Sequence, residues 1–342
     1  MTQILTSSVG SYPRIGEEKD QQRHRRALHH LQNKEISSHA FHDVEQSVIQ
    51  EVIREQILTG LDEVTDGHVS WHDPIFHFCR KVTGIKMGGL ARFFDTNTYY
   101  RIPIFTSKNP RAKALHTLSD FLFAQSISNK PIRCVVTGPY TLASLSFSEI
   151  DFFSKFERRL AFFSDLIQFE ISNLVSQGAK IIQIDEPALT RDTRNSSLFF
   201  QTMKRLRDMT KPAKLVLSLS HGPLSTLYSH LLETPVDVLN LDFTYDGKTL
   251  FDCIIQSPPT MVLGFGLINA RQARLDPIDP VLKVIHSWIE KKNPAEIYLT
   301  PSCGLEHLPR PIAFAKLKLI EQIRRESQIY LEREAAHAAP KN

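Results

Sequence analysis

Eight short apolar runs recur along this chain of 342 residues, and segments with helical periodicity separate them. Strands that alternate with helices indicate parallel βαβ units, and eight such units favour an α/β fold of the closed (β/α)8 TIM barrel type over an open sheet. With 42% hydrophobic residues, the chain can bury a large core. The predicted strands cover residues 4–9, 63–66, 132–137, 180–185, 215–219, 236–242, 261–266 and 297–300.

Two of the segments between strands, residues 43–58 and 156–174, have amphipathic helical spacing and are predicted to pack on the outside of the barrel. The longest irregular insertion, residues 81–105, falls between the second and third strands. We expect it over the carboxyl-end face, where it can cover a ligand. Since no repeat or linker divides the chain, residues 1–330 are predicted to form one barrel domain and 331–342 a frayed tail.

Composition excludes several classes of partner. The formal charge is only +4, and the cations are spread among acids, so no nucleic-acid partner is expected. The four cysteines lie far apart without a CxxC pair, which argues against a disulfide scaffold or a zinc ribbon and for a reducing compartment. No stretch approaches the apolar length that spans a bilayer, and no signal-peptide pattern is present. We therefore expect a cytoplasmic protein without a membrane partner.

The segment KIIQIDEPAL at 180–189 leads an apolar strand into two adjacent acids and a proline. Pro187 prevents the ladder from continuing, so Asp185 and Glu186 stand where the strand leaves the core. Acids at the carboxyl end of a strand in an α/β protein occupy the usual position for ligand chemistry. An equally good interpretation of this motif alone is that one acid caps the next helix.

Other polar residues follow the predicted strands in the same way. Such residues are costly to bury without a purpose, and the barrel topology brings all of them to one mouth. Their convergence, more than any single residue, predicts a functional site. The set comprises Ser11, Asp66, His68, Asp185, Glu186, His221, Asp242 and Cys303.

Three members of this set could bind a metal ion. His221, Asp242 and Cys303 would follow strands five, six and eight, and together they offer the nitrogen, oxygen and sulfur donors that Zn²⁺ accepts. Three ligands with an open fourth position describe a catalytic site, in which zinc would lower the pKa of an incoming thiol. Because no short spacing ties the three together, the alternative is that Cys303 is a small core residue.

A cationic run, KDQQRHRR at 19–26, follows the first strand. Most such runs are solvated helix faces. The functional alternative is that Lys19 and Arg23, helped by Arg92 on the insertion, bind a polyanionic tail of a substrate.

Six motifs spread over nearly the whole chain form a specific signature: GSYPRIG at 10–16, DG at 66–67, FDTN at 94–97, KPIRCVVTGPYTLASLSF at 130–147, QIDEPAL at 183–189 and TPSCGLEHLP at 300–309. In these motifs the chain resembles the cobalamin-independent methionine synthase family. Long members of that family carry two related barrels in tandem, and the resemblance implies a single barrel here. It also implies methyl transfer from a folate polyglutamate to the thiol of homocysteine, with a zinc ion that activates the thiol.

The resemblance assigns the zinc ligands. The family's His-x-Cys pair falls on Leu219 and His221, its Glu on Asp242 and its last Cys on Cys303. His221, Asp242 and Cys303 are therefore predicted to hold Zn²⁺, with one ligand lost and two altered.

The resemblance also assigns homocysteine-binding positions to Ser11, His68 and Asp185, with Glu186 beside them. Ser11 and Asp185 match the family pattern. His68 replaces a glutamate, and a histidine cannot neutralise the ammonium group of the substrate as a glutamate does. Catalytic roles are predicted for Asp185 and His221.

Several motifs are more similar to the family's amino-terminal barrel, which holds no zinc and supplies basic residues to the folate tail. Lys19 and Arg92 correspond to those basic residues, whereas Gln22 replaces a lysine.

The main hypothesis is a methyltransferase that makes methionine from homocysteine and a methyl-folate or another methyl carrier. The alternative is a non-catalytic barrel that binds folate or a separate catalytic-barrel protein. A third possibility is a related barrel that acts on another substrate, as in uroporphyrinogen decarboxylase, since fold does not fix function. That enzyme would need an arginine-rich pocket for several carboxylates, and the predicted strand ends do not provide one.

Overall fold

The computed structural model describes residues 2–114 and 117–338 of the chain. Contacts divide the chain into two compact units. Unit 1 comprises Met1–Val69, Ile127–Pro131 and Leu239–Asn342, and unit 2 comprises Ser70–Ser126 and Ile132–Val238.

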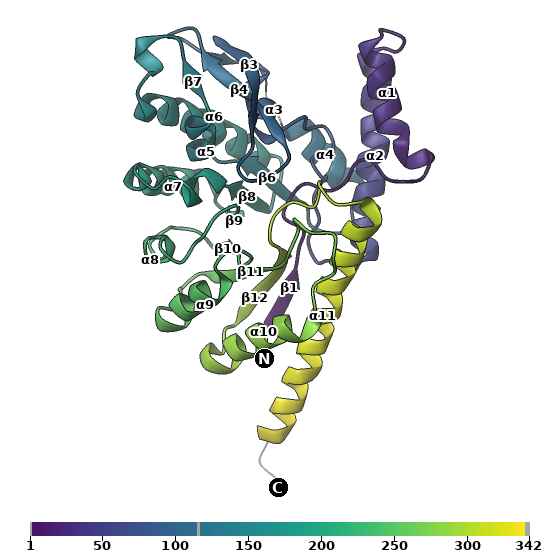
Figure 1. The fold of residues 1–342 in the computed structure, drawn as a ribbon, viewed down its shortest axis with the longest axis vertical. Coiled ribbons are helices and arrows are strands. Elements are labelled where there is room, and N and C mark those ends of the chain that lie inside the picture. The colour runs from purple at the N-terminus through teal and green to yellow at the C-terminus, as the bar shows by residue number, and fades with distance from the viewer. Residues whose placement is uncertain (1, 115–116, 339–342) are drawn as a thin grey trace. The chain divides into compact units, whose positions relative to one another are not determined.

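Unit 1 is built on strands in the order β1 (Gln3–Thr6), β12 (Glu296–Pro301), β11 (Val262–Ile268) and β10 (Val238–Asp242). β12 pairs in parallel with both β1 and β11. In Figure 1, α10 and the long helix α11 run beside these strands, and the two helices pack against each other. The helices of this unit are η1 (Asp20–Gln22), α1 (Arg23–Gln32), α2 (Ser38–Leu58), α9 (Gly247–Gln256), α10 (Ile278–Lys292) and α11 (Arg310–Ala338).

Unit 2 is built on the parallel strands β6 (Arg133–Thr137), β8 (Ile181–Asp185) and β9 (Lys214–Leu219). Almost every residue of these strands is buried, as expected for parallel strands covered on both faces. The helices of this unit are α3 (Pro74–Cys79), α4 (Leu118–Ile127), α5 (Pro139–Ser144), η2 (Asp151–Phe153), α6 (Phe156–Ser176), η3 (Pro187–Thr190), α7 (Ser196–Thr210) and α8 (Tyr228–Leu231).

The insertion predicted over 81–105 is an antiparallel hairpin of β3 (Ile85–Arg92) and β4 (Tyr99–Phe105) in unit 2. Its register shifts between Met87 and Leu90, where two adjacent glycines allow a bulge. Two-residue strands extend the hairpin region: β7 (Phe147–Ser148) pairs with β4, and β2 (Val82–Thr83) pairs with β5 (Arg111–Ala112).

The strand predicted over 63–66 is reduced to bridge residues at Glu63 and Val64, of which Glu63 pairs in parallel with Ser7. The side chain of Gln56 in α2 replaces the strand partner. Its Oε1 accepts from the Thr65 backbone N at 3.0 Å, and its Nε2 donates to the Thr65 backbone O at 2.8 Å. The prediction of a full strand was wrong because a buried side chain takes the hydrogen bonds that a ladder would use.

The other seven predicted strands are present, with shifts of a few residues at their ends. The helix predicted from 43 begins earlier because Ser37 caps it, accepting a hydrogen bond from the Ala40 backbone N at 3.1 Å. The tail predicted to fray from 331 continues α11 to Ala338, since the sequence EREAAHA consists mainly of strong helix formers. Residues 339–342 lie outside the described residues, and the boundaries predicted for a single domain stay a prediction.

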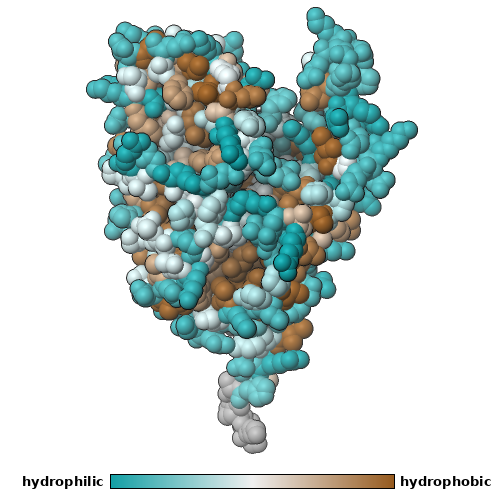
Figure 2. Space-filling model, in the orientation of Figure 1, coloured by the Kyte–Doolittle hydropathy of each residue, from teal (hydrophilic) through white to brown (hydrophobic). Residues whose placement is uncertain are grey.

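None of the helices in the described part of the chain is long and apolar enough to cross a membrane. Figure 2 shows hydrophilic residues interspersed with brown hydrophobic areas over the face in view.

The Gln56 side chain offers a test of this local packing. Gln56→Met keeps its length but leaves the Thr65 backbone groups and the Ser8 hydroxyl, 2.6 Å from Gln56 Oε1, without this partner. We expect the free energy of unfolding in urea to fall by about 2–4 kcal/mol.

The matched control is Gln50→Met, an exposed position on the same helix, where a change within about 0.5 kcal/mol is expected. Equal effects of the two substitutions would contradict a special role for Gln56.

Candidate functional site

Asp242 ends β10 with a fully buried side chain, and an arginine holds its carboxylate. Arg271 Nη1 donates to Oδ2 at 2.9 Å, and Nη2 donates to Oδ1 at 3.3 Å. Oδ1 also accepts from the Thr244 backbone N at 2.9 Å and from Thr244 Oγ1 at 2.6 Å. Because a buried carboxylate needs a paired charge, Arg271 is the counterion that stabilises Asp242 at this position.

Arg271 also contacts Cys303. Its Nη1 lies 3.5 Å from Cys303 Sγ, in the loop that follows β12. Burial raises the pKa of the Cys303 thiol to about 12, although the Arg271 charge opposes this shift. The thiol is therefore protonated at neutral pH and is a weak nucleophile.

The zinc set predicted from the sequence does not fit a metal ion in this arrangement. Arg271 engages both Asp242 and Cys303, and Leu219, where the resemblance expected a ligand, is fully buried. The third predicted ligand, His221, belongs to unit 2. Within the described ranges 2–114 and 117–338, no group of three His, Cys, Asp or Glu residues is placed to hold a metal.

Ser11 and His68 meet in unit 1, as their predicted positions after neighbouring strands require. Ser11 Oγ lies 2.9 Å from His68 Nδ1. Gly10 adopts a φ of +128°, and a Cβ there would come within 2.7 Å of the His68 ring, so only glycine allows this approach. The backbone O of Ser11 accepts from Leu305 N at 2.8 Å, which ties the first strand's loop to the Cys303 loop.

His68 is 8% exposed, and burial lowers its pKa to about 3. Its imidazole is therefore neutral at physiological pH. A neutral imidazole can exchange hydrogen bonds with an amino-acid ligand but cannot supply a charge.

In unit 2, Asp185 ends β8 and is held by a short chain of buried polar groups. Gln183 Nε2 donates to Asp185 Oδ1 at 2.7 Å, and Arg133 Nη1 donates to Gln183 Oε1 at 2.9 Å. Arg133 and Gln183 are almost completely buried, whereas Asp185 is partly exposed. The core thus orients the carboxylate while the residue stays partly exposed, as a ligand-binding acid requires.

Glu186, by contrast, caps a helix. Its Oε1 accepts from Tyr140 N at 2.9 Å, and its Oε2 accepts from Thr141 N at 2.7 Å and Thr141 Oγ1 at 2.6 Å. These donors lie in the first turn of α5, so the capped helix precedes the motif in the chain and is not the next one. Burial raises the pKa of Glu186 to about 7. Both oxygens are engaged by α5, which gives Glu186 a structural role, and its predicted contact with substrate stays a prediction.

His221 follows β9 with a φ of +70° and is covered by the hairpin of the same unit. Its ring centroid lies 5.7 Å from the rings of both Phe93 and Phe94. Arg191 donates to the His221 backbone O and pairs with Asp95 at the hairpin tip. The tip of the insertion therefore packs against the carboxyl end of β9.

The two basic residues predicted to bind a folate tail are both exposed. Lys19 precedes η1 in unit 1. In unit 2, Arg92 Nε donates to the Thr96 backbone O at 2.6 Å and Nη2 to Asn97 Oδ1 at 3.4 Å, so it closes the turn of its own hairpin. Gln22, at the position of the expected lysine, donates to the backbone O of Gly16 and closes the PRIG loop.

Arg271 and Arg191 were not identified from the sequence. Arg271 stands five residues beyond the predicted end of the seventh strand, and the strand-end set contains no residue from that strand. A search extended to the loop after 261–266 would have found it.

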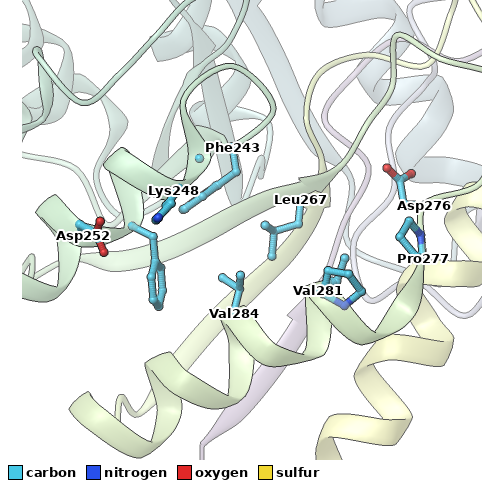
Figure 3. A pocket seen from close by; sticks show the side chains of 11 residues that line it. Phe243, Lys248, Asp252, Leu267, Asp276, Pro277, Val281 and Val284 are labelled. Atoms are coloured by element: carbon cyan, nitrogen blue, oxygen red, sulfur yellow. The ribbon is translucent and has the colours of Figure 1, made fainter.

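A pocket of about 420 Å³ lies between α9 and α10 of unit 1 (Figure 3). Leu267 from β11 and Val281 and Val284 from α10 point into it, and Lys248 and Asp252 stand on the α9 side. Its lining is mostly apolar and includes none of the predicted site residues.

Comparison with known proteins identifies the enzyme family to which this chain belongs. The family model described as "Cobalamin-independent synthase, Catalytic domain" matches residues 4–326. A methionine synthase of Sulfurisphaera tokodaii is 30% identical over 320 residues, which cover 92% of this chain and 89% of that protein. A methionine synthase of Saccharolobus islandicus is 31% identical over 318 residues, with 92% of each chain covered.

The fold is similar to that of a B12-independent methionine synthase from Shewanella sp. W3-18-1 solved in complex with selenomethionine. The TM-score is 0.78 at 15% identity, and the match covers 96% of this chain and 98% of that one. The (β/α)8 fold class predicted from the sequence is confirmed.

The neutral state of His68 predicts a pH-dependent stability. The unfolded chain takes up a proton on this histidine near pH 6.5, whereas the folded chain does so only near pH 3. Stability is therefore lost as the pH falls below about 6.5. Between pH 7 and pH 5.5, we expect wild type to lose about 1 kcal/mol more of its free energy of unfolding in urea than His68→Asn, since asparagine tolerates the positive φ. His39→Asn, at an exposed histidine of α2, should keep the wild-type slope. Identical slopes for wild type and His68→Asn would contradict the buried neutral imidazole.

The Glu186 cap predicts that Gly138 tolerates no side chain. A Cβ at Gly138 would lie 2.1 Å from Glu186 Cδ. Gly138→Ala is expected to lower the free energy of unfolding by about 1–3 kcal/mol. Gly89→Ala, in the hairpin where a Cβ has open space, is the control and should change it by less than about 0.5 kcal/mol. A neutral Gly138→Ala would show that Glu186 does not sit against α5 as described.

Proposed function

Because the chain belongs to the cobalamin-independent methionine synthase family, we propose that it transfers a methyl group from a methylfolate to the thiol of homocysteine, giving methionine. The observation that carries this proposal is the match of the family's catalytic-domain model to residues 4–326. In the reaction, a sulfur–carbon bond forms and the nitrogen–carbon bond of the donor breaks. The proton lost by the thiol ends on the released nitrogen.

Asp185 is the residue proposed to bind the ammonium group of homocysteine. Of the two acids in the DEPAL motif, it is the one that Gln183 and Arg133 orient from the core while leaving it partly exposed. A carboxylate held in place before the ligand arrives loses little entropy on binding. The roles predicted for Ser11 and His68 in holding the amino acid stay predictions, as does a catalytic role for His221.

The methyl donor is proposed to be a folate with a polyglutamate tail, and Lys19 and Arg92 are the proposed tail contacts. Arg92 would have to exchange its hydrogen bonds to Thr96 and Asn97 for contacts with the tail. Charge-assisted pairs with carboxylates are stronger than such neutral bonds, which favours the exchange. A cytoplasmic location, expected from the dispersed cysteines, belongs to the same proposal.

The non-catalytic alternative receives less support, because the model that matches the chain is that of the catalytic domain. No step of the proposed reaction passes through a metal ion, since Arg271 engages both Asp242 and Cys303. The need for a separate catalytic-barrel protein stays a prediction.

The proposal is tested by incubating the purified protein with homocysteine and methyltetrahydrofolate, as the monoglutamate and as the triglutamate, and measuring methionine by mass spectrometry. We expect methionine to form, with a lower KM for the triglutamate. Failure to form methionine with either donor would overturn the proposal.

Asp185→Asn removes the charge that binds the ammonium group. We expect the KM for homocysteine to rise by about tenfold or more, because a hydrogen bond to a charged group contributes roughly 1.5–3 kcal/mol. Asp208→Asn, an exposed acid of α7 that pairs with Lys211, is the control and should leave KM unchanged. An unchanged KM in Asp185→Asn would assign ammonium binding to another residue.

A further inference from the structure

We propose that Arg271 takes the place of a metal ion in this site and keeps divalent cations away from Asp242 and Cys303. The inference deepens the proposed function by naming the fixed cation of the same site. It rests on the proposed function only in assuming that the site serves methyl transfer. Whether a metal ion occupies the site can be measured without any enzymatic turnover.

The position of the guanidinium carries the inference. Nη1 of Arg271 lies 2.9 Å from Asp242 Oδ2 and 3.5 Å from Cys303 Sγ, so one nitrogen contacts two of the three predicted ligands. A zinc ion bound to the same two atoms would stand about 2.0 Å from the oxygen and about 2.3 Å from the sulfur. It would lie against that nitrogen, and two positive centres would compete for one carboxylate.

The remaining acceptors of Asp242 are also in use. Thr244 donates to Oδ1 from both its backbone N and its hydroxyl, and Arg271 Nη2 donates to the same oxygen. A metal ion could therefore gain Asp242 only by displacing donors that already satisfy it. The pair of Asp242 and Arg271 is electrically neutral, whereas adding a divalent cation beside it would leave an excess of positive charge.

Arg271 is anchored and is not a mobile surface arginine. Its guanidinium carbon lies 4.6 Å from the centre of the Tyr245 ring, and its backbone N donates to Asn269 Oδ1 at 2.9 Å. The backbone N of the preceding residue, Ala270, donates to Ser302 Oγ at 3.1 Å and so ties this loop to the Cys303 loop.

The far end of the same loop is fixed by a buried lysine. Lys316 of α11 is fully buried, and its Nζ donates to Asp276 Oδ2 at 2.8 Å and to the Arg274 backbone O at 2.7 Å. Asp276 Oδ1 in turn accepts from Asn269 N at 3.2 Å. Displacing the Arg271 guanidinium would therefore also disturb a loop held at both ends.

The test compares metal binding by wild type, Arg271→Met, Arg271→Lys and the control Arg274→Met, an exposed arginine of the same loop. Each protein is purified without chelator, its metal content is measured by mass spectrometry, and it is titrated with Co²⁺. We expect wild type, Arg271→Lys and Arg274→Met to hold far less than one equivalent and to show no cobalt–thiolate absorption. Arg271→Met leaves Asp242 buried without its counterion and should bind close to one equivalent, with an absorption band that Cys303→Ser removes in the same background.

Thermal unfolding gives a second measurement. Co²⁺ should raise the Tm of Arg271→Met, because an ion that binds only the folded state stabilises it, and should leave the wild-type Tm unchanged. If Arg271→Met folds only with Co²⁺, the inference is supported. If Arg271→Met folds neither with nor without Co²⁺, the test is the metal content of wild type and Arg271→Lys. Both proteins must then stay free of metal in excess Co²⁺.

Two results would overturn the inference: about one equivalent of metal in wild type that Cys303→Ser abolishes, or a folded Arg271→Met that binds no metal. Methionine formation by wild type, measured with and without chelator, separates this outcome from the proposed function. Activity lost with chelator counts against the inference, whereas no activity in either condition counts against the proposed function and leaves the metal measurement valid.

Discussion

A charged group that is buried away from water must be paired with an opposite charge or with hydrogen-bond donors. This constraint determines the structure at the carboxyl ends of the parallel strands in both units. Asp242 is fully buried, and the ion pair with Arg271 from the loop after β11 makes its charge tolerable there. To deliver that guanidinium, the loop after β11 must turn back over β10, and contacts with Ser302, Asp276 and buried Lys316 hold it in this path. The ion pair and these contacts together connect the loops that follow β10, β11 and β12.

The other acids near the strand ends obey the same rule in different ways. Glu186 is satisfied by the first turn of α5, and Glu63 accepts from the Tyr298 hydroxyl at 2.6 Å inside unit 1. Asp185 differs because Gln183 orients its carboxylate while the residue stays partly exposed. Burial and partners therefore separate acids that stabilise the fold from an acid suited to a ligand, although all of them look alike in the sequence.

Local patterns in the sequence sufficed for seven of the eight strands, because apolar runs report burial directly. They failed over 63–66, where Gln56, a residue of a neighbouring helix, takes the hydrogen bonds of a strand. They also placed Asp185, Ser11 and His68 at strand ends, but they could not show that Glu186 faces α5. Arg271 was missed because the strand-end set took no residue from the loop after 261–266. Its role as the counterion of Asp242 depends on a tertiary contact that spacing along the chain does not record.

The charges of the Asp242 carboxylate and the Arg271 guanidinium balance each other within unit 1. Without Arg271, unit 1 would keep a buried carboxylate, Asp242, and a buried thiol, Cys303, which attract cations. With Arg271 but a full set of anionic ligands, a negative charge would stay uncompensated in the core. One carboxylate and one fixed guanidinium, beside a Cys303 thiol that stays protonated, together give a neutral arrangement.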